Sequence, residues 1–209
     1  MEYGKIIILN GAPRSGKSSI ATQIQNTFEG PWLNIGVDAY VKHLLPKSLL
    51  PGIGLRPGGE RKDLESFIVT CYAALYETIA AHSRLGLNVV VDVGHHDSYA
   101  RPLFILRDCA KRLAGLPVLF VGVKCSLAVI MARRNHSQED ERTSYVKGAS
   151  ADPVPFPVQL WQEKVHEPGI YDLEVDTTDA SPEAAAAIIG AHLHLCKPTA
   201  NAFDKLRSS

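Results

Sequence analysis

The sequence predicts an α/β fold in which a parallel sheet of about five strands is covered by helices on both faces. Short runs of apolar residues alternate along the 209-residue chain with longer stretches of helical periodicity. The runs are apolar at consecutive positions, which is typical of strands buried between two layers of helices. Polar residues gather directly after these runs, at the carboxyl edge of the sheet, where proteins of this class bind their ligands.

The first half of the chain contains three predicted strands and two predicted helices. A strand over 5–9 leads through a Gly-rich turn into a helix that ends near residue 28, and a second strand follows over 32–35. From 64 to 85, apolar residues recur at intervals of three and four, which predicts a long helix. The run 87–93 predicts the third strand.

The segment before the long helix fits neither a helix nor a strand. Residues 46–60 contain three prolines and four glycines, so no regular element is expected there. The segment is nevertheless too apolar for a loop that only faces solvent, because it also carries Leu49, Leu50, Ile53 and Leu55.

The second half continues the alternation without an internal repeat or a linker, so the chain 1–209 is interpreted as one domain. The predicted elements are helices over 98–113, 126–134 and 158–166, strands over 116–123 and 173–176, and a last helix from 182 to about 196. Pro102 is tolerated in the first turn of its helix, and Ser181 with Pro182 is a good helix start. The tail 197–209 is expected to be flexible.

The turn after the first strand carries the strongest functional signal. Residues 11–18 read Gly-Ala-Pro-Arg-Ser-Gly-Lys-Ser and match GxxxxGK[ST] in full, between a predicted strand and a predicted helix. In this motif the backbone N–H groups curl around phosphate oxygens at the helix N-terminus. Lys17 is expected to reach the β- and γ-phosphates of ATP, and Ser18 to ligate Mg²⁺. The predicted nucleotide-binding residues of this loop are Gly11, Ala12, Pro13, Arg14, Ser15, Gly16, Lys17, Ser18 and Ser19.

Two aspartates stand at the ends of the second and third strands. Asp92 ends an apolar run, a position that predicts a Mg²⁺ ligand, with a helix cap or a turn as the alternative. Asp38 is placed to face the γ-phosphate from the side opposite the nucleotide, where it would act as general base for an acceptor hydroxyl. The alternative is an N-cap for a helix from Ala39, and both roles are compatible because a cap uses only part of the carboxylate.

Two histidines and three arginines have weaker assignments. His95 and His96 are adjacent and have no third ligand at a recognisable spacing, so contact with substrate or with a site residue is favoured over zinc. Arg133 is predicted to neutralise charge on the transferred phosphoryl group, with a solvated helix end as the alternative. Arg134 and Arg142 follow it and are given no role.

Composition restricts the possible partners. The chain has 22 Lys and Arg against 22 Asp and Glu and is 45% hydrophobic, which excludes disorder and argues against a nucleic acid as partner. Its apolar runs are far shorter than the roughly 20 residues of a membrane-spanning helix. The first residues show no signal-peptide pattern and the four cysteines are scattered, so a cytoplasmic protein without a membrane partner is expected. A homo-oligomer is compatible with the sequence.

With these residues in place, the sequence resembles the chloramphenicol phosphotransferase family of P-loop kinases over most of its length. The resemblance rests on 7–11 running into the P-loop, the Gly-Val-Asp of 36–38, and the segments 31–33, 121–125, 165–166 and 171–178. It implies a three-layer sandwich with a helical lid over about 134–158, and ATP-dependent phosphorylation of a small-molecule hydroxyl. It also implies that Asp38 takes the place of the general base and that Arg133 begins the lid. The stretch Asp176-Thr177-Thr178, and Thr178 in particular, is expected to lie near the nucleotide base.

The predicted acceptor is small and largely uncharged, such as a chloramphenicol-like antibiotic or a related metabolite, because the segment 46–60 is mostly apolar. Departures from the family pattern fall in the lid, where 137–142 is acidic, and after the third strand. A nucleotide or nucleoside kinase is the first alternative, and it should show basic residues where a second phosphate binds. A non-catalytic nucleotide-binding module is the second.

Overall fold

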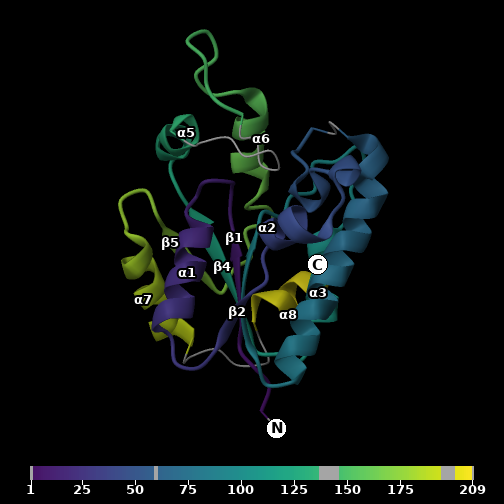
Figure 1. The fold of residues 1–209 in the computed structure, drawn as a ribbon, viewed down its shortest axis with the longest axis vertical. Coiled ribbons are helices and arrows are strands. Elements are labelled where there is room, and N and C mark those ends of the chain that lie inside the picture. Colours follow the sequence, from purple (N-terminus) through teal and green to yellow (C-terminus); the bar gives the residue numbers. More distant parts are fainter. Residues whose placement is uncertain (1, 59–60, 137–145, 194–200, 209) are drawn as a thin grey trace.

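The computed structural model of the chain describes residues 2–58, 61–136, 146–193 and 201–208 (Figure 1). Five parallel strands form one sheet in the order β2-β3-β1-β4-β5. The strands are β1 (Ile6–Asn10), β2 (Trp32–Asn34), β3 (Asn88–Val93), β4 (Val118–Lys124) and β5 (Leu173–Asp176). The predicted parallel sheet is confirmed, and its central strand β1 delivers the P-loop to the middle of the carboxyl edge.

Helices cover both faces of the sheet because the strands carry apolar side chains on both faces. One core contains Ile7 and Leu9 of β1 and lies under two helices, whereas Ile6 and Ile8 belong to the core of the opposite face. The helices of the first face are α1 (Lys17–Thr27) and α7 (Pro182–Leu193). Those of the second are α3 (Glu65–Arg84), α4 (Ile105–Arg112) and α8 (Ala202–Ser208). Figure 1 shows the two groups on either side of the strands.

A third, smaller core lies beyond the carboxyl edge of the sheet. It joins α5 (Leu127–Asn135) to α6 (Phe156–Lys164), and both helices stand above the strands in Figure 1. Met131 and Trp161 are buried in this core. Of the predicted lid over 134–158, residues 137–145 with Arg142 lie outside the described residues.

The segment between β2 and α3 is irregular, as the prolines and glycines predict. It begins with α2 (Val37–Ala39) and a π-helical turn over Tyr40–Leu44, followed by short 3₁₀ turns. Leu55 of this segment is only 1% exposed and packs in the core under α3. The part of the segment up to residue 58 is therefore a wall that packs on the core at the edge of the sheet.

The helix predicted over 98–113 is shorter than expected and begins only at Ile105. The Asp97 carboxylate explains the delay, because Oδ1 accepts hydrogen bonds from the backbone N–H of Leu103 (2.7 Å) and of Phe104 (3.1 Å). These bonds hold an extended loop, and Pro102 lies in that loop rather than in the helix.

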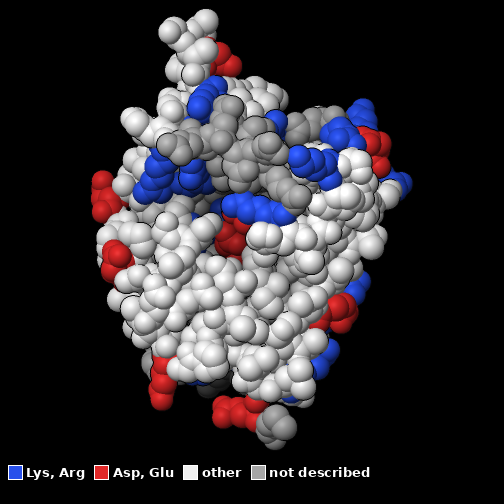
Figure 2. All heavy atoms as spheres, viewed as in Figure 1, with Lys and Arg blue, Asp and Glu red and all other residues white. Residues whose placement is uncertain are grey.

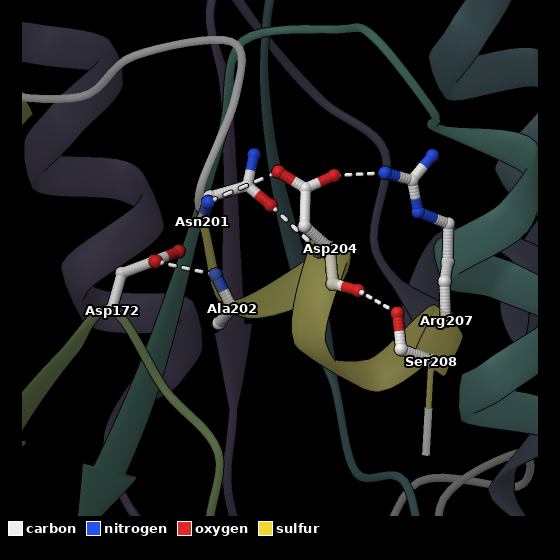
Figure 3. Close-up of polar contacts among 6 residues, drawn as sticks. All are labelled: Asp172, Asn201, Ala202, Asp204, Arg207 and Ser208. Atoms are coloured by element: carbon white, nitrogen blue, oxygen red, sulfur yellow. Dashed lines mark hydrogen bonds and ion pairs between the residues drawn. The ribbon is translucent and has the colours of Figure 1, made fainter.

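The prediction of a flexible C-terminal tail is wrong for residues 201–208. Asn201 and Asp204 exchange hydrogen bonds in a capping arrangement at the start of α8, and the Asp204 carboxylate pairs with Arg207 (Figure 3). Asp172 accepts from the N–H of Ala202 (2.7 Å), which ties the helix to the start of β5. The apolar face of α8 is buried through Ala202, Phe203 and Leu206, although the tail as a whole is polar in composition.

No helix among the described residues is both long and apolar enough to cross a lipid bilayer.

Candidate active site

The P-loop adopts a conformation that its glycines make possible. Gly16 has φ of 97°, a left-handed value that favours glycine, and the N–H of Ser15 bonds the carbonyl of Ala12 (3.1 Å). At Gly11 a side chain is excluded by space, because a Cβ there would stand 2.5 Å from the carbonyl oxygen of Val123. The loop is thus packed directly against the end of β4.

Lys17 begins α1 and is 9% exposed. Its ammonium donates to the carbonyl oxygens of Gly11 (2.8 Å) and Ala12 (2.9 Å), so the charge lies across the mouth of the loop. Burial lowers the pKa of Lys17 to about 8, although the nearby carboxylates of Asp92 and Asp38 act in the opposite direction. A phosphate bound here would give the Lys17 ammonium a fully charged anionic partner in place of these carbonyl oxygens.

Ser18 and Asp92 are in direct contact, so one Mg²⁺ ion could reach both side chains. The Ser18 hydroxyl donates to Asp92 Oδ2 at 2.7 Å, and the carboxylate is 8% exposed. Both are hard oxygen donors, and Mg²⁺ usually takes only one or two protein ligands besides phosphate oxygens and water, so these two residues fit the ion. Gly36 leaves room for the carboxylate, since a Cβ there would lie 1.6 Å from Asp92 Oδ1.

Asp38 lies in the first turn of α2 and lines the same pocket as Lys17 and Asp92. It is not the N-cap of this helix, because that position belongs to Gly36. Burial raises the pKa of Asp38, and the negative charge of Asp92 raises it further, against the opposing charges of Lys42, Lys17 and Arg14. A carboxyl in this environment has an increased affinity for a proton, which suits a base.

The pocket that these residues share has a volume of about 570 Å³. P-loop residues line it together with side chains of 37–56, Arg61, the end of β3, and one side chain each of α5 and α6. Figure 2 shows acidic atoms inside a hollow with basic side chains beside it. The lining residues outside the P-loop include Val37, Asp38, Val41, Leu50, Pro51, Ile53, Arg56, Arg61, Asp92, Arg134 and Trp161.

The two consecutive arginines of α5 lie in different places. Arg133 donates through Nη1 to the carbonyl of Arg14 (3.1 Å) and through Nη2 to that of Thr177 (3.0 Å), so it ties the P-loop to the end of β5. Arg134, to which the sequence gives no role, is 3% exposed and lines the pocket. The predicted contact of Arg133 with the transferred phosphate stays a prediction.

Thr178 lies beside the loop after β4. Its Oγ1 accepts from the N–H of Ser126 (2.9 Å), and its predicted contact with the nucleotide base stays a prediction. The neighbouring Thr177 is 4% exposed, and its hydroxyl lies 2.6 Å from the carbonyl of Ser15 and 3.0 Å from that of Lys124. Thr177 therefore supports the P-loop, a role that the sequence does not reveal.

His95 and His96 are buried in the wall behind the pocket. His95 Nε2 is hydrogen-bonded to the hydroxyl of Tyr76 (2.8 Å), and burial lowers its pKa to about 3, so its imidazole is neutral. His96 donates from Nε2 to the carbonyl of Leu55 (3.0 Å). Within the described ranges, no three or more His, Cys, Asp or Glu side chains are grouped to hold a metal ion. His96 thus bonds the backbone between the lining residues Gly54 and Arg56, and the predicted contact with substrate or with a site residue stays a prediction.

Trp161 lines the pocket and Asn10 joins the elements around it, and neither residue was predicted as a site residue. The Asn10 amide donates to the carbonyl of Val165 (2.7 Å) and accepts from the N–H of His95 (2.8 Å), which joins β1 to the segment after β3 and to the end of α6. The indole of Trp161 donates to the carbonyl of Gly94 at 3.4 Å. A single Asn closing an apolar strand directly before the P-loop is the signal that identifies Asn10.

Comparison with known proteins gives relatives of the whole chain. Two proteins from Mycobacterium tuberculosis, strains CDC 1551 and H37Rv, are each 27% identical to it over 221 residues, covering 99% of this chain and 89% of their own. Both carry the name "Putative O-phosphotransferase".

Solved structures with a similar fold are P-loop kinases. Shikimate kinase from Acinetobacter baumannii matches with a TM-score of 0.58 at 14% identity, covering 93% of this chain and 94% of its own. The APS kinase CysC of Mycobacterium tuberculosis matches with a TM-score of 0.56 at 16% identity, covering 93% and 99%. At these identities the likeness establishes the three-layer kinase fold.

The family assignment rests on a match that includes all five strands of the sheet. The model described as "Chloramphenicol phosphotransferase-like protein" matches residues 4–194, from before β1 to the end of α7. The chain therefore belongs to the chloramphenicol phosphotransferase-like family, and it is an enzyme of the kinase class.

Proposed function

We propose that the protein transfers the γ-phosphate of ATP, bound with Mg²⁺, to a hydroxyl of a small molecule, with Asp38 as general base. The observation that carries the proposal is that Asp38 lines one pocket with Lys17, Ser18 and Asp92. A phosphate-binding ammonium, a pair of metal-binding oxygens and a carboxyl of raised pKa therefore share a single cavity.

In the proposed reaction, Asp38 accepts the proton of the acceptor hydroxyl, and the oxygen of that hydroxyl attacks the γ-phosphorus. The bond from that phosphorus to the β–γ bridging oxygen breaks, and ADP leaves. Lys17 balances the negative charge on the β- and γ-phosphates, and Arg134, which lines the same pocket, adds a second positive charge. A Mg²⁺ ion held by Ser18 and Asp92 would supply further charge neutralisation between the phosphates.

Two further roles belong to the proposal. Thr178 at the end of β5 is proposed to lie near the nucleotide base, and Arg133 to begin a lid over about 134–158. Contacts of Arg133 with Arg14 and Thr177 support such a role, because a movement of the lid would act on the P-loop through the same side chain. The acceptor is proposed to be a hydroxylated small molecule, and the family description makes chloramphenicol-like antibiotics the first compounds to test.

Replacement of the base tests this function. Asp38→Asn keeps the size of the side chain and removes its ability to accept a proton, so phosphoryl transfer should fall by about 10²- to 10⁴-fold. Transfer is followed as ADP release and product mass with hydroxylated antibiotics and metabolites. The matched control is Asp108→Asn on α4, whose carboxylate pairs with Arg112 and does not line the pocket.

Nucleotide binding should survive the same substitution. Asp38 faces the acceptor side, so the Kd of MgATP in Asp38→Asn should stay within about threefold of that of the parent protein. Unchanged turnover in the variant removes Asp38 from the mechanism. A panel in which no hydroxyl compound raises ADP release above the water background contradicts the kinase function.

A further inference from the structure

We infer that the protein has a second small-molecule site, a cavity behind the active-site pocket that binds an uncharged, planar molecule through a carbonyl oxygen. The inference goes beyond the proposed kinase reaction and does not depend on it. The cavity has a volume of about 250 Å³. It is lined by the loop after β3, the first turn of α4, the loop after α6 and one side chain of α8, and no described residue lines both cavities.

His95 brings a buried hydrogen-bonding group to this cavity. Its side chain is 2% exposed and lies against the ring of Tyr72, with ring centroids 4.5 Å apart. Nε2 is bonded to the hydroxyl of Tyr76 (2.8 Å), whereas Nδ1 has no hydrogen bond to any of the described residues. The neighbouring His96 differs, because both of its ring nitrogens are hydrogen-bonded to backbone groups.

The bond to Tyr76 determines which ring nitrogen of His95 carries the proton. The imidazole is neutral, because burial lowers the pKa of His95 to about 3. The Tyr76 side chain is fully buried, and in the described part of the chain its hydroxyl is hydrogen-bonded to Nε2 alone. A buried O–H needs an acceptor, so the hydroxyl donates to Nε2. The proton of the neutral imidazole is therefore on Nδ1, and His95 offers the cavity an N–H donor.

The first turn of α4 adds backbone donors to the same cavity. The hydrogen-bond ladder of this helix begins with the N–H of Asp108, which donates to the carbonyl of Phe104 (3.1 Å). The N–H groups of Ile105 and Leu106 precede the ladder and have no partner within the helix, and both residues line the cavity. Together with the N–H of His95, this end of the helix favours a ligand that brings an oxygen acceptor.

The charges around the cavity favour an uncharged ligand. Among the described residues that line it, Asp97 and Glu167 are acidic and Arg107 is basic, so charges of both signs are present. Asp97 is held at the start of α4 by two backbone hydrogen bonds. An anion beside the buried N–H of His95 would lose its water and gain only a neutral donor, with a carboxylate nearby. A carbonyl oxygen gains the same hydrogen bond without this cost.

The size and the apolar lining suit a ring that carries the carbonyl group. Ile105 and Leu206 line the cavity and are each 3% exposed, so they add aliphatic surface to it. An apolar cavity of about 150 Å³ is sufficient for benzene. A volume of about 250 Å³ therefore leaves room for an aromatic ring with a planar substituent such as a carboxamide.

The cavity lies directly behind the acceptor wall, the part of the active-site pocket formed by side chains of 37–56. His96 lines the cavity, and its Nε2 donates to the carbonyl of Leu55 (3.0 Å). Leu55 lies between Gly54 and Arg56, which line the active-site pocket. A molecule in the cavity would therefore be next to the residue that holds the acceptor wall.

Benzamide and benzoate test the site, because they have nearly the same shape and differ in charge. Each is titrated into ¹⁵N-labelled protein, and the backbone amide signals of Ile105 and Leu106 report binding. We expect benzamide to shift these signals and to bind about tenfold more tightly than benzoate. Equal affinities overturn the inference. So does a benzamide titration in which these signals stay in place, including one that shifts only Val41 and Gly54 of the active-site pocket.

Two variants connect the binding to the cavity. His95→Gln keeps an acceptor for the Tyr76 hydroxyl and removes the Nδ1 donor, so the Kd of benzamide should rise about tenfold. Leu106→Trp fills the cavity from a half-buried position and should abolish binding. The matched control is Ile188→Trp, at a half-exposed position of α7 on the opposite face of the sheet, where the Kd should not change. Unchanged binding in Leu106→Trp overturns the inference even where His95→Gln fails to fold.

The protonation of His95 is a separate test that needs no ligand. Long-range ¹H–¹⁵N spectra of the imidazole should show the proton on Nδ1 at neutral pH, with Nε2 unprotonated. A proton on Nε2 would remove the donor from the cavity and overturn the inference.

Discussion

The two sides of the pocket, the nucleotide half and the acceptor half of the proposed reaction, are built in different ways. The nucleotide half comes mainly from one continuous stretch, 11–18, with Asp92 added by the neighbouring strand β3 and Arg134 by α5. The acceptor half is assembled from side chains of 37–56, from Arg61, and from Trp161 of α6, which follows Arg61 by 100 residues. Local backbone geometry shapes the first half, and packing against α3 and the loop after β3 shapes the second.

The difference shows where each kind of specificity resides. Phosphate binding uses backbone N–H groups whose directions follow from a short glycine-containing turn, so a motif of eight residues describes it. The acceptor wall uses side chains whose positions depend on His96 and Tyr72, which hold the carbonyls of Leu55 and Ile53. Changes at the junction of the two halves should therefore have the largest effects.

Gly36 lies at that junction, and after Asp38→Asn its replacement should have the largest effect. In Gly36→Ala the new Cβ would overlap Asp92 Oδ1 at 1.6 Å, so the carboxylate must shift and its contact with Ser18 is disturbed. A displacement of about 1 Å in a catalytic group costs about 10²-fold in rate, and the Mg²⁺ concentration for half-maximal activity should rise as well.

The control for this substitution is Gly54→Ala in the acceptor wall. There a Cβ would meet only Val41 Cγ2 at 3.9 Å, an ordinary contact, so the dependence on Mg²⁺ should not change. A normal Mg²⁺ titration in Gly36→Ala would show that Asp92 does not hold the ion.

The alkaline side of the pH profile tests Lys17, and therefore the nucleotide half alone. The pKa of Lys17 is lowered to about 8, so its positive charge is complete below this pH and is lost as the pH rises through it. The kcat/KM for MgATP should therefore fall above pH 8, by about tenfold for each further unit when the ammonium is essential. Lys17→Arg keeps the charge at every accessible pH, and its profile should lose this alkaline decline. A decline at the same pH in that variant would assign it to another group.

On the acid side, the raised pKa of Asp38 should stop the reaction at a higher pH than an ordinary aspartate would. The decline should be missing from the residual activity of Asp38→Asn, which is measured in the same titration.

The smallest effect is expected where the nucleotide half is tied to the end of β5. Arg133→Gln loses charge-assisted bonds to the carbonyls of Arg14 and Thr177, which contribute about 1.5–3 kcal/mol in typical proteins. A loss of about 1 kcal/mol lowers Tm by roughly 2–4 °C in a protein of this size, so a decrease of several degrees is expected in a thermal melt. Arg84→Gln should leave Tm unchanged, and an equal Tm in Arg133→Gln would show that the tie is not structural.

Most of the fold follows from local patterns in the sequence. Consecutive apolar residues in β1, β3 and β4 identify strands covered on both faces, and the periodicity of α3 identifies a helix to within a residue of its ends. The exceptions depend on contacts between distant residues. α4 begins late because Asp97 bonds the N–H groups of Leu103 and Phe104, and the tail folds because Asp172 caps it from another part of the chain.

In the site too, some features follow from local sequence and others from contacts between distant residues. The sequence by itself determined the phosphate loop and the two carboxylates, because strand–loop–helix geometry places residues after parallel strands at one edge of the sheet. Only the tertiary structure decided which arginine of the consecutive pair lines the pocket and which bonds the P-loop, since one residue of helix turns a side chain by about 100°. It also decided that the apolar segment before α3 packs in the core through Ile53 and Leu55, while Arg56 and Arg61 of the same segment line the pocket.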